Sequence, residues 1–458
     1  RNIISQDYAR NEEFRKAAEC LLQLDSSNTD QATLERSLVR AAEICNQFLE
    51  GRDAIDIASQ LGPRLIEINQ VGPAAQLYLA AELPKEAVDV FIQSEQWSKA
   101  RRLAKEIDGE MVAYVESQQK SRLKTEGNIE QLADIDIMSA LDMLAEQGQW
   151  VRCLEKAKQM NVKVLHKYLA LYAAQLIRDG DSPAALSLYL THGAPALQQN
   201  FNIYNRIALD CFSLREQFAN NIWKDLRTFL FQLSLFSESE ILDKIDQLLL
   251  IAHYYTSRSV FRQVQALQGI AVKISVALLR YTDIIPVDKG FFEAGTDLRN
   301  VGRESEAFVI LNHYLDLCEA IEEGSGNLID HSDLSATDFP SSVPLPEDLH
   351  LKNEISLHEE VREWVLAVSM DQKVDQILPL DDRNLFESSL GMSDVPCIVS
   401  GYPVSGRQPV LFQRSNKQAS RDAWSKLTVA AKMAPSSEIP DIIEFIEKWC
   451  GSANFVIH

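Results

Sequence analysis

The sequence predicts a mainly α-helical protein, an α-solenoid of paired helices followed by a small α+β domain. Two observations support this prediction. A pattern of small and apolar residues with helical spacing recurs along residues 1–323, and short strand-like runs appear after residue 390. At 458 residues the chain is too long for one compact core, whereas a stack of helix pairs can grow to this length.

The repeated pattern is clearest between Val71 and Phe91. Counted from Val71, small or apolar residues stand at offsets of 3, 4, 7, 16 and 20, and the same offsets recur from Leu169 and Phe291. The first three offsets share one helical face, and the jump to 16 passes a turn and reaches a second helix. A looser copy starts at Ile137. We therefore expect antiparallel, tetratricopeptide-like helix pairs that stack on their neighbours.

Alanine or glycine at offsets 4 and 16 indicates close helix crossings, because interaxial distances of about 8 to 10 Å leave no room for larger side chains. The predicted repeat-packing positions are Ala74, Ala75, Tyr78, Ala87, Phe91, Ala173, Ala185, Gly295 and Ala307. The alternative is that the aromatic positions line a peptide-binding groove. Core packing is favoured, because the recognisable repeats carry no group of basic residues to clamp a peptide carboxylate.

Two further features of the solenoid are predicted from local sequence. Gly62-Pro63 and Gly72-Pro73 stand about ten residues apart, and we expect one short helix between these two pairs. Residues 201–281 form the most apolar stretch, where the repeat fits poorly. Longer helices are expected there.

The composition changes after residue 323. Residues 324–350 contain no lysine or arginine and are rich in glycine, serine, proline and aspartate, which predicts an acidic, mobile linker. Residues 351–384 are expected to form a bridging helix, to about residue 374, and a connection. Residues 385–458 are expected to form the small α+β domain.

Within that last domain, the strand-like runs 396–399 and 409–412 are predicted to form two arms of a loop-rich hairpin. Helices are expected from about residue 419 to 431 and from Pro440 to Gly451, because proline opens helices and glycine ends them. Two strands and two helices in about 70 residues are near the lower limit for an unaided core.

Composition excludes several classes of function. A formal net charge of −21 argues against binding to nucleic acid or to an anionic membrane surface. No run approaches the roughly 18 to 20 apolar residues of a membrane span, and no signal-peptide pattern opens the chain. Seven widely separated cysteines fit a reducing compartment, and a start at Arg1 suggests a fragment of a longer protein.

No catalytic constellation, metal site or cofactor motif is predicted. Gly401 and Gly406 have the spacing of a phosphate-binding loop, but Arg407-Gln408 follows where that motif needs Lys and then Ser or Thr. The eight histidines show no ligand spacing beside the cysteines. A glycine-containing turn explains the loop, and a structural metal is not expected.

The C-terminal domain resembles a U-box, the zinc-free relative of the RING finger of ubiquitin ligases. The residues that carry the resemblance are Pro396-Cys397-Ile398-Val399-Ser400-Gly401-Tyr402-Pro403-Val404 for its first loop, Gln408-Pro409-Val410, and 421–427 for its central helix. The resemblance implies loops held by hydrogen bonds instead of metal. It also implies that Val399, with Ile398 beside it, and Pro435 contact a ubiquitin-conjugating enzyme. Binding of ubiquitin itself is an alternative.

Taken whole, the chain resembles the C-terminal part of the largest peripheral subunit of intraflagellar transport complex B. The order of solenoid, acidic linker and terminal domain carries this resemblance, together with residues 397–427. It implies two WD40 propellers before the solenoid and a location in the cilium or flagellum, at the ciliary base and in the cytoplasm. It further implies contacts with other intraflagellar transport subunits, of the same complex and of the partner complex.

Three functional hypotheses follow. A non-enzymatic scaffold in cilium assembly and cargo transport is favoured, in which the solenoid presents surfaces to partner proteins. The alternative is an E3 ubiquitin ligase that acts through the U-box-like domain. A vesicle-coat subunit shares the solenoid but gives no reason for the terminal domain.

Overall fold

A computed structural model describes residues 2–24, 30–236, 239–326, 329–335, 337–371, 373–378, 395–404 and 409–455. The chain divides into two compact units, Arg1–Gln159 and Met160–His458. This division falls inside the predicted solenoid. The C-terminal domain belongs to the same unit as the helices of the second half of the solenoid.

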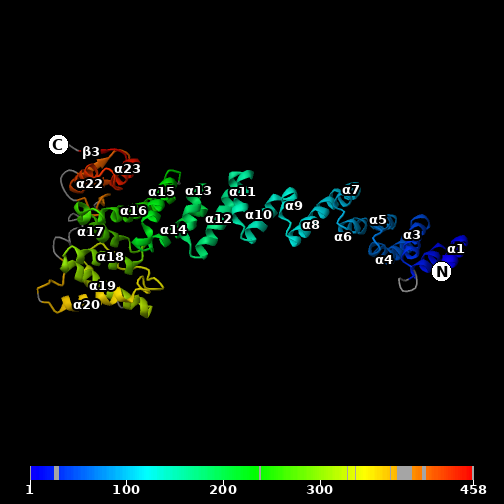
Figure 1. The fold of residues 1–458 in the computed structure, drawn as a ribbon, viewed down its shortest axis with the longest axis horizontal. Coiled ribbons are helices and arrows are strands. Elements are labelled where there is room, and N and C mark those ends of the chain that lie inside the picture. The colour runs from blue at the N-terminus through cyan, green and yellow to red at the C-terminus, as the bar shows by residue number, and fades with distance from the viewer. Residues whose placement is uncertain are drawn as a thin grey trace. The chain divides into compact units, whose positions relative to one another are not determined.

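The first unit is a succession of helices (Figure 1). Their bounds are α1 Asn2–Arg10, α2 Phe14–Leu22, α3 Gln31–Phe48, α4 Gly51–Glu67, α5 Val71–Ala80, α6 Pro84–Gln93, α7 Trp97–Ile107, α8 Gly109–Glu126, α9 Ile129–Ile135, α10 Ile137–Glu146 and α11 Trp150–Met160. From α1 to α10 each helix contacts the next one, and several contact the next but one. Such packing between sequence neighbours defines a solenoid, as predicted.

The helix pair α5 and α6 corresponds to the clearest copy of the repeat. Ala74, Ala75 and Ala87 are buried, Tyr78 is also buried, and Phe91 is half-buried. The expected short helix between the glycine-proline pairs is wrong, because Gly62 lies inside α4. A methyl group at Gly62 would collide with the Tyr78 ring, so this glycine permits close packing of α4 on α5 and ends no helix.

The second unit contains further helices packed in sequence order. Their bounds are α12 Val162–Arg178, α13 Ser182–His192, η1 Gln198–Asn200, α14 Phe201–Phe212, α15 Glu216–Ser234, α16 Ser239–Arg262, η2 Gln265–Leu267, α17 Gln268–Ala277, η3 Leu278–Tyr281, α18 Val287–Asn300, α19 Glu304–Glu323, η5 Ser332–Leu334 and α20 Ile355–Ser369. The long α15 and α16 confirm the longer helices expected in the apolar stretch. Neighbouring helices from α12 to α20 contact one another.

The repeat-packing positions of this unit are all buried. Ala173, Ala185 and Ala307 have no exposed surface. Gly295 faces Leu311, and a methyl group at the glycine would lie 2.5 Å from the leucine side chain. Offsets 4 and 20 of the repeat therefore meet at the crossing of α18 and α19.

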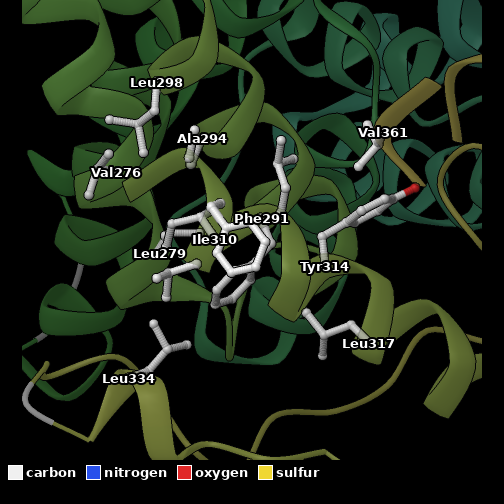
Figure 2. Close-up of a cluster of buried hydrophobic side chains, with 14 of the residues drawn as sticks. Val276, Leu279, Phe291, Ala294, Leu298, Ile310, Tyr314, Leu317, Leu334 and Val361 are labelled. Atoms are coloured by element: carbon white, nitrogen blue, oxygen red, sulfur yellow. The ribbon is translucent and has the colours of Figure 1, made fainter. Parts of the chain in front are cut away.

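The segment after α19 is packed against the solenoid, which differs from the mobile linker that its composition predicts. Leu334 and Leu351 belong to the same buried cluster as Phe291, and Figure 2 shows Leu334 and Val361 at this cluster. Asp338 also forms an ion pair with Arg280, 2.8 Å apart. Apolar residues spaced between the polar ones supply this packing, and overall composition does not reveal them.

The C-terminal domain contains a three-stranded antiparallel sheet and two helices. The elements are β1 Val410–Phe412, β2 Gln418–Ala419, α22 Arg421–Met433, α23 Ile439–Cys450 and β3 Ala453–Phe455, with strand order β2-β1-β3. Val410 pairs with Ala419 on one side and with Phe455 on the other. The two predicted helices are confirmed.

The predicted hairpin between residues 396–399 and 409–412 is wrong. Pro396 and Cys397 form isolated bridges to Pro403 and Gln418 instead. The reason lies in the loop itself, since the Cys397 N–H donates to the Tyr402 carbonyl, 2.7 Å away, and closes the loop on its own residues. Residues 385–394 and 405–408, which include Gly406 and Gln408, lie outside the described residues.

Candidate functional site

The strongest candidate site is the interface where the C-terminal domain packs on α15, α16 and α17, here called the docking interface. On the domain side it contains the first loop, residues 396–404, and one face of α23. Contacts between α16 and α23 and between η2 and α22 define its extent (Figure 1). We describe it from the first loop outward.

The first loop is built around the thiol of Cys397. The N–H groups of Ser400 and Ser420 point at its sulfur, at 3.4 and 3.2 Å. Gly401 has a φ of +76°, a conformation that favours glycine, and its N–H donates to the Cys397 carbonyl. Backbone hydrogen bonds to this sulfur thus hold the first loop against the residue that follows β2.

Two side chains of α16 bind the backbone of this loop. Tyr254 donates its hydroxyl hydrogen to the Cys397 carbonyl, 3.0 Å away, and His253 Nε2 lies 3.0 Å from the Ile398 carbonyl. A carbonyl only accepts, so Nε2 carries the hydrogen of a neutral imidazole. Burial lowers the pKa of His253 to about 3, and the charges of Arg227 and Lys417 contribute to this shift.

Aromatic packing surrounds the histidine. Its ring stacks on Phe445 of α23, with centroids 5.7 Å apart, and meets the Trp449 ring edge-on. Phe231 of α15 packs edge-on against the same Phe445, and the Arg227 guanidinium lies 4.1 Å from the centroid of that ring. Burial lowers the pKa of Arg227 to about 10. The imidazole is therefore fully buried among aromatic rings.

Close backbone approach marks the other end of the first loop. A methyl group built on Gly401 would overlap the Cβ of Ala277 in α17. The next residue, Tyr402, joins the buried cluster that contains Val272 and Val276, and the Lys273 ammonium lies 5.4 Å from the centroid of its ring. The loop can lie on α17 only because both contact positions are small.

Ion pairs form the rim of the interface. Lys417, before β2, pairs with Asp246 at 2.6 Å and places its ammonium 4.5 Å from the Trp449 ring centroid. Lys224 pairs with Asp441 at 3.0 Å. The side chains of Lys224 and Asp441 are 40% and 51% exposed, so this pair is screened by water and contributes little stability.

A second buried group of charges lies on the far side of α16. Arg258 pairs with Glu293 of α18 at 2.8 Å, and Lys289 of the same helix lies 3.8 Å from this carboxylate. Burial alone would raise the pKa of Glu293, but the two cations reverse the shift and lower it to about 2. Burial lowers the pKa of Lys289 to about 8. These charges join α16 to α18 and so fix the helix that carries His253.

The residues predicted to contact a ubiquitin-conjugating enzyme do not share one accessible face in this arrangement. Ile398 and Val399 are each 1% exposed, within the docking interface. Pro435, after α22, is exposed. Of the three predicted contact residues, Ile398 and Val399 are therefore buried and Pro435 is exposed.

Sequence reasoning did not anticipate His253, Tyr254 or Lys417 as interface residues. A signal was present, because residues 251–261 of α16 include only two basic side chains, His253 and Arg258, and no acidic one, and all of these residues are buried. A helix that is buried all round needs a further covering element. That element proved to be a loop about 145 residues further along the chain.

Two absences concern the described part of the chain alone. Its helices include none with the length and apolarity needed to cross a membrane. Among the same residues, no three histidine, cysteine or acidic side chains are grouped so that they could hold a metal ion.

Comparisons with known proteins identify relatives over nearly the whole chain. The Drosophila melanogaster protein named intraflagellar transport protein 172 homolog is 65% identical over 464 residues, which cover 99% of this chain and 26% of that relative. The homolog of the same name from Danio rerio is 42% identical over 99% of this chain, and the Homo sapiens homolog is 44% identical over 96%. These matches cover 27% and 26% of those two relatives.

Other comparisons add little. No protein-family model matches the chain. A solved circular tandem repeat protein aligns over 81% of this chain and 88% of its own, with 15% identity and a TM-score of 0.16, which is too low to support an argument.

The fold and the docking interface define a helical-repeat protein with a folded terminal domain packed on its own repeats. The chain belongs to the intraflagellar transport protein 172 family. It spans about a quarter of the length of these relatives.

Proposed function

We propose that this chain is a non-enzymatic scaffold segment of the intraflagellar transport machinery. It presents solenoid surfaces to other transport subunits, of its own complex B and of the partner complex, in the cilium or flagellum and at the ciliary base. One observation carries the proposal: relatives named for intraflagellar transport match 99% of a chain whose helices pack in sequence order from α1 to α10 and from α12 to α20. Repeat proteins of this kind bind partners over extended surfaces.

The test is co-elution of the purified chain with individual purified transport subunits on a sizing column. Exposed apolar side chains are natural contact points, so Val151→Glu probes the first unit and Leu366→Glu probes the second. Val151 is 72% exposed and Leu366 is 59% exposed, so neither change should disturb folding. We expect stable co-elution of at least one subunit. Failure of every subunit to co-elute with the unaltered chain would overturn the proposal.

A second candidate function is contact with a ubiquitin-conjugating enzyme or with ubiquitin, as in an E3 ligase of the U-box type. The observation that favours it is the hydrogen bonding of the first loop, in which the Cys397 sulfur accepts from the N–H groups of Ser400 and Ser420. Val399, Ile398 and Pro435 are the proposed contact residues. A ubiquitin-transfer assay with a panel of conjugating enzymes tests this function. Transfer that is unaffected by Pro435→Ala and by Val399→Arg would exclude it.

A further inference from the structure

The burial of the first loop is unusual for a loop. All six residues from Cys397 to Tyr402 are buried. Loops normally run over a protein surface, because their backbone polar groups need water. Here α16 supplies the missing partners, since Tyr254 and His253 bind the carbonyls of Cys397 and Ile398. The solenoid therefore takes the place that solvent or a partner would otherwise occupy.

We propose that this docking is an autoinhibitory contact, in which α16 and α17 cover Ile398 and Val399 and exclude a ubiquitin-conjugating enzyme until the C-terminal domain is released. The inference rests on the second candidate function above. The C-terminal domain then has two states. In the closed state, which the structure represents, the first loop lies on α16 and α17, and in the open state it does not contact them.

The arrangement suits two-step access. Pro435 is exposed in the closed state, so a partner can touch one part of the proposed contact face before release. Ile398 and Val399 are each 1% exposed, and in this proposal they become available when the domain moves away from α16. A partner that binds the open state better than the closed state shifts the population toward release.

The contact between Gly401 and Ala277 offers a way to open the interface from the solenoid side. Because the loop leaves no room for a larger residue at Ala277, Ala277→Glu should force the first loop away without altering any proposed contact residue. Gly269→Glu is the matched control. It adds the same charge to the same helix, at a position where a Cβ would meet open space.

The experiment uses the full chain and two measurements. Hydrogen exchange over residues 397–402 reports whether the loop is uncovered, and titration with a purified panel of ubiquitin-conjugating enzymes, with free ubiquitin in a separate arm, reports binding. For Ala277→Glu we expect exchange at least about tenfold faster and conjugating-enzyme binding at least about tenfold tighter. The Gly269→Glu control should match the unaltered chain in both measurements.

A second variant guards against misfolding of the first. Lys224→Glu combined with Asp246→Lys reverses two partly exposed rim charges and leaves the core untouched. Like Ala277→Glu, this double variant should show faster hydrogen exchange in the first loop and tighter binding of the conjugating enzyme. Lys417→Asp added to it should partly restore the closed state, because it rebuilds the ion pair with position 246 in the opposite sense.

The outcomes separate the two ideas. Equal enzyme binding by the unaltered chain and by the opened variants would overturn autoinhibition and leave the candidate function standing. An uncovered loop that binds neither the enzymes nor ubiquitin would overturn the candidate function itself. Binding of free ubiquitin alone would overturn the choice of partner. Unchanged exchange in both opened variants would show that docking does not protect the loop.

Discussion

His253 Nε2 lies 3.0 Å from the carbonyl oxygen of Ile398, so a neutral imidazole joins the middle of the solenoid to the first loop of the C-terminal domain. The donor role of Nε2 requires no charge on the ring. The groups that face it from the surrounding elements are Arg227 of α15 and Lys417 before β2, both cationic. A second proton on this histidine is thus opposed by burial and by two positive charges.

Acid should therefore weaken docking through His253. Its pKa falls to about 3 in the folded chain from the ordinary value of 6.5, so the unfolded chain binds the extra proton first. Stability is complete above about pH 6.5 and is lost as the pH falls from there toward 3, by about 2 kcal/mol at pH 5. Urea unfolding at pH 7.5 and pH 5 measures this difference.

The comparison variant is His253→Gln, whose amide can still donate to the Ile398 carbonyl but cannot titrate. It should lose less stability than the unaltered chain over the same pH range. His313 and His350, whose pKa values are also lowered to about 4, remain in both proteins, so their contributions cancel in the comparison. An identical pH dependence in the two chains would show that His253 is not the titrating group.

Removing the carboxylate of Glu293 should strongly destabilise the second unit. Glu293→Gln leaves Arg258 and Lys289 buried without their anion, and breaking such a pair costs about 3 to 5 kcal/mol. The low pKa of Glu293 also predicts stability that is present above about pH 4.5 and is lost as the pH falls toward 2. Denaturant unfolding of the full chain measures the free energy.

Asp348→Asn is the control for this prediction. Asp348 pairs with Lys352, but both side chains are more than 60% exposed, so its loss should change the unfolding free energy by less than about 1 kcal/mol. If the two substitutions changed the unfolding free energy equally, the explanation by burial of the Glu293 ion pair would be wrong.

The sequence predicted best what depends on local spacing. The offset of 16 that placed Ala87, Ala185 and Ala307 at helix crossings depends only on the helical period and on the length of one turn, and all three residues are fully buried. Gly62 was misread as a helix end because a glycine that admits Tyr78 has the same local sequence as one that ends a helix. Local spacing does not distinguish these two uses.

The docking interface could not be derived in this way. It joins residues of α16 and the first loop that are about 145 positions apart, and the glycine and the two prolines of the first loop are equally typical of a surface turn. The pairing of His253 with Ile398 depends on how the domain rests on α16 and α17. No repeat or motif encodes that placement, although the all-round burial of α16 required some covering element.

The terminal domain should fold without a metal. The sulfur of Cys397 already accepts two backbone hydrogen bonds, and strand pairing of β1 with β2 and β3 closes the sheet. We therefore expect elemental analysis to find no stoichiometric zinc in the purified chain. A chelator should leave the thermal unfolding midpoint unchanged. If the domain did hold a structural metal, its removal would take away folding free energy and lower this midpoint. One zinc ion per chain would place the domain in the RING class instead.

Two glycines of α18 provide a matched test of the helix-crossing geometry. A methyl group at Gly295 would lie 2.5 Å from the Leu311 side chain, whereas one at Gly290 would meet its neighbours at 3.5 Å, an ordinary contact. Gly295→Ala should therefore destabilise the chain by about 1 to 3 kcal/mol through overpacking. Gly290→Ala should stabilise it by up to about 1 kcal/mol, because alanine loses less backbone entropy than glycine in a helix. Both values come from denaturant unfolding, and effects of the same sign would mean that α18 and α19 do not cross at Gly295.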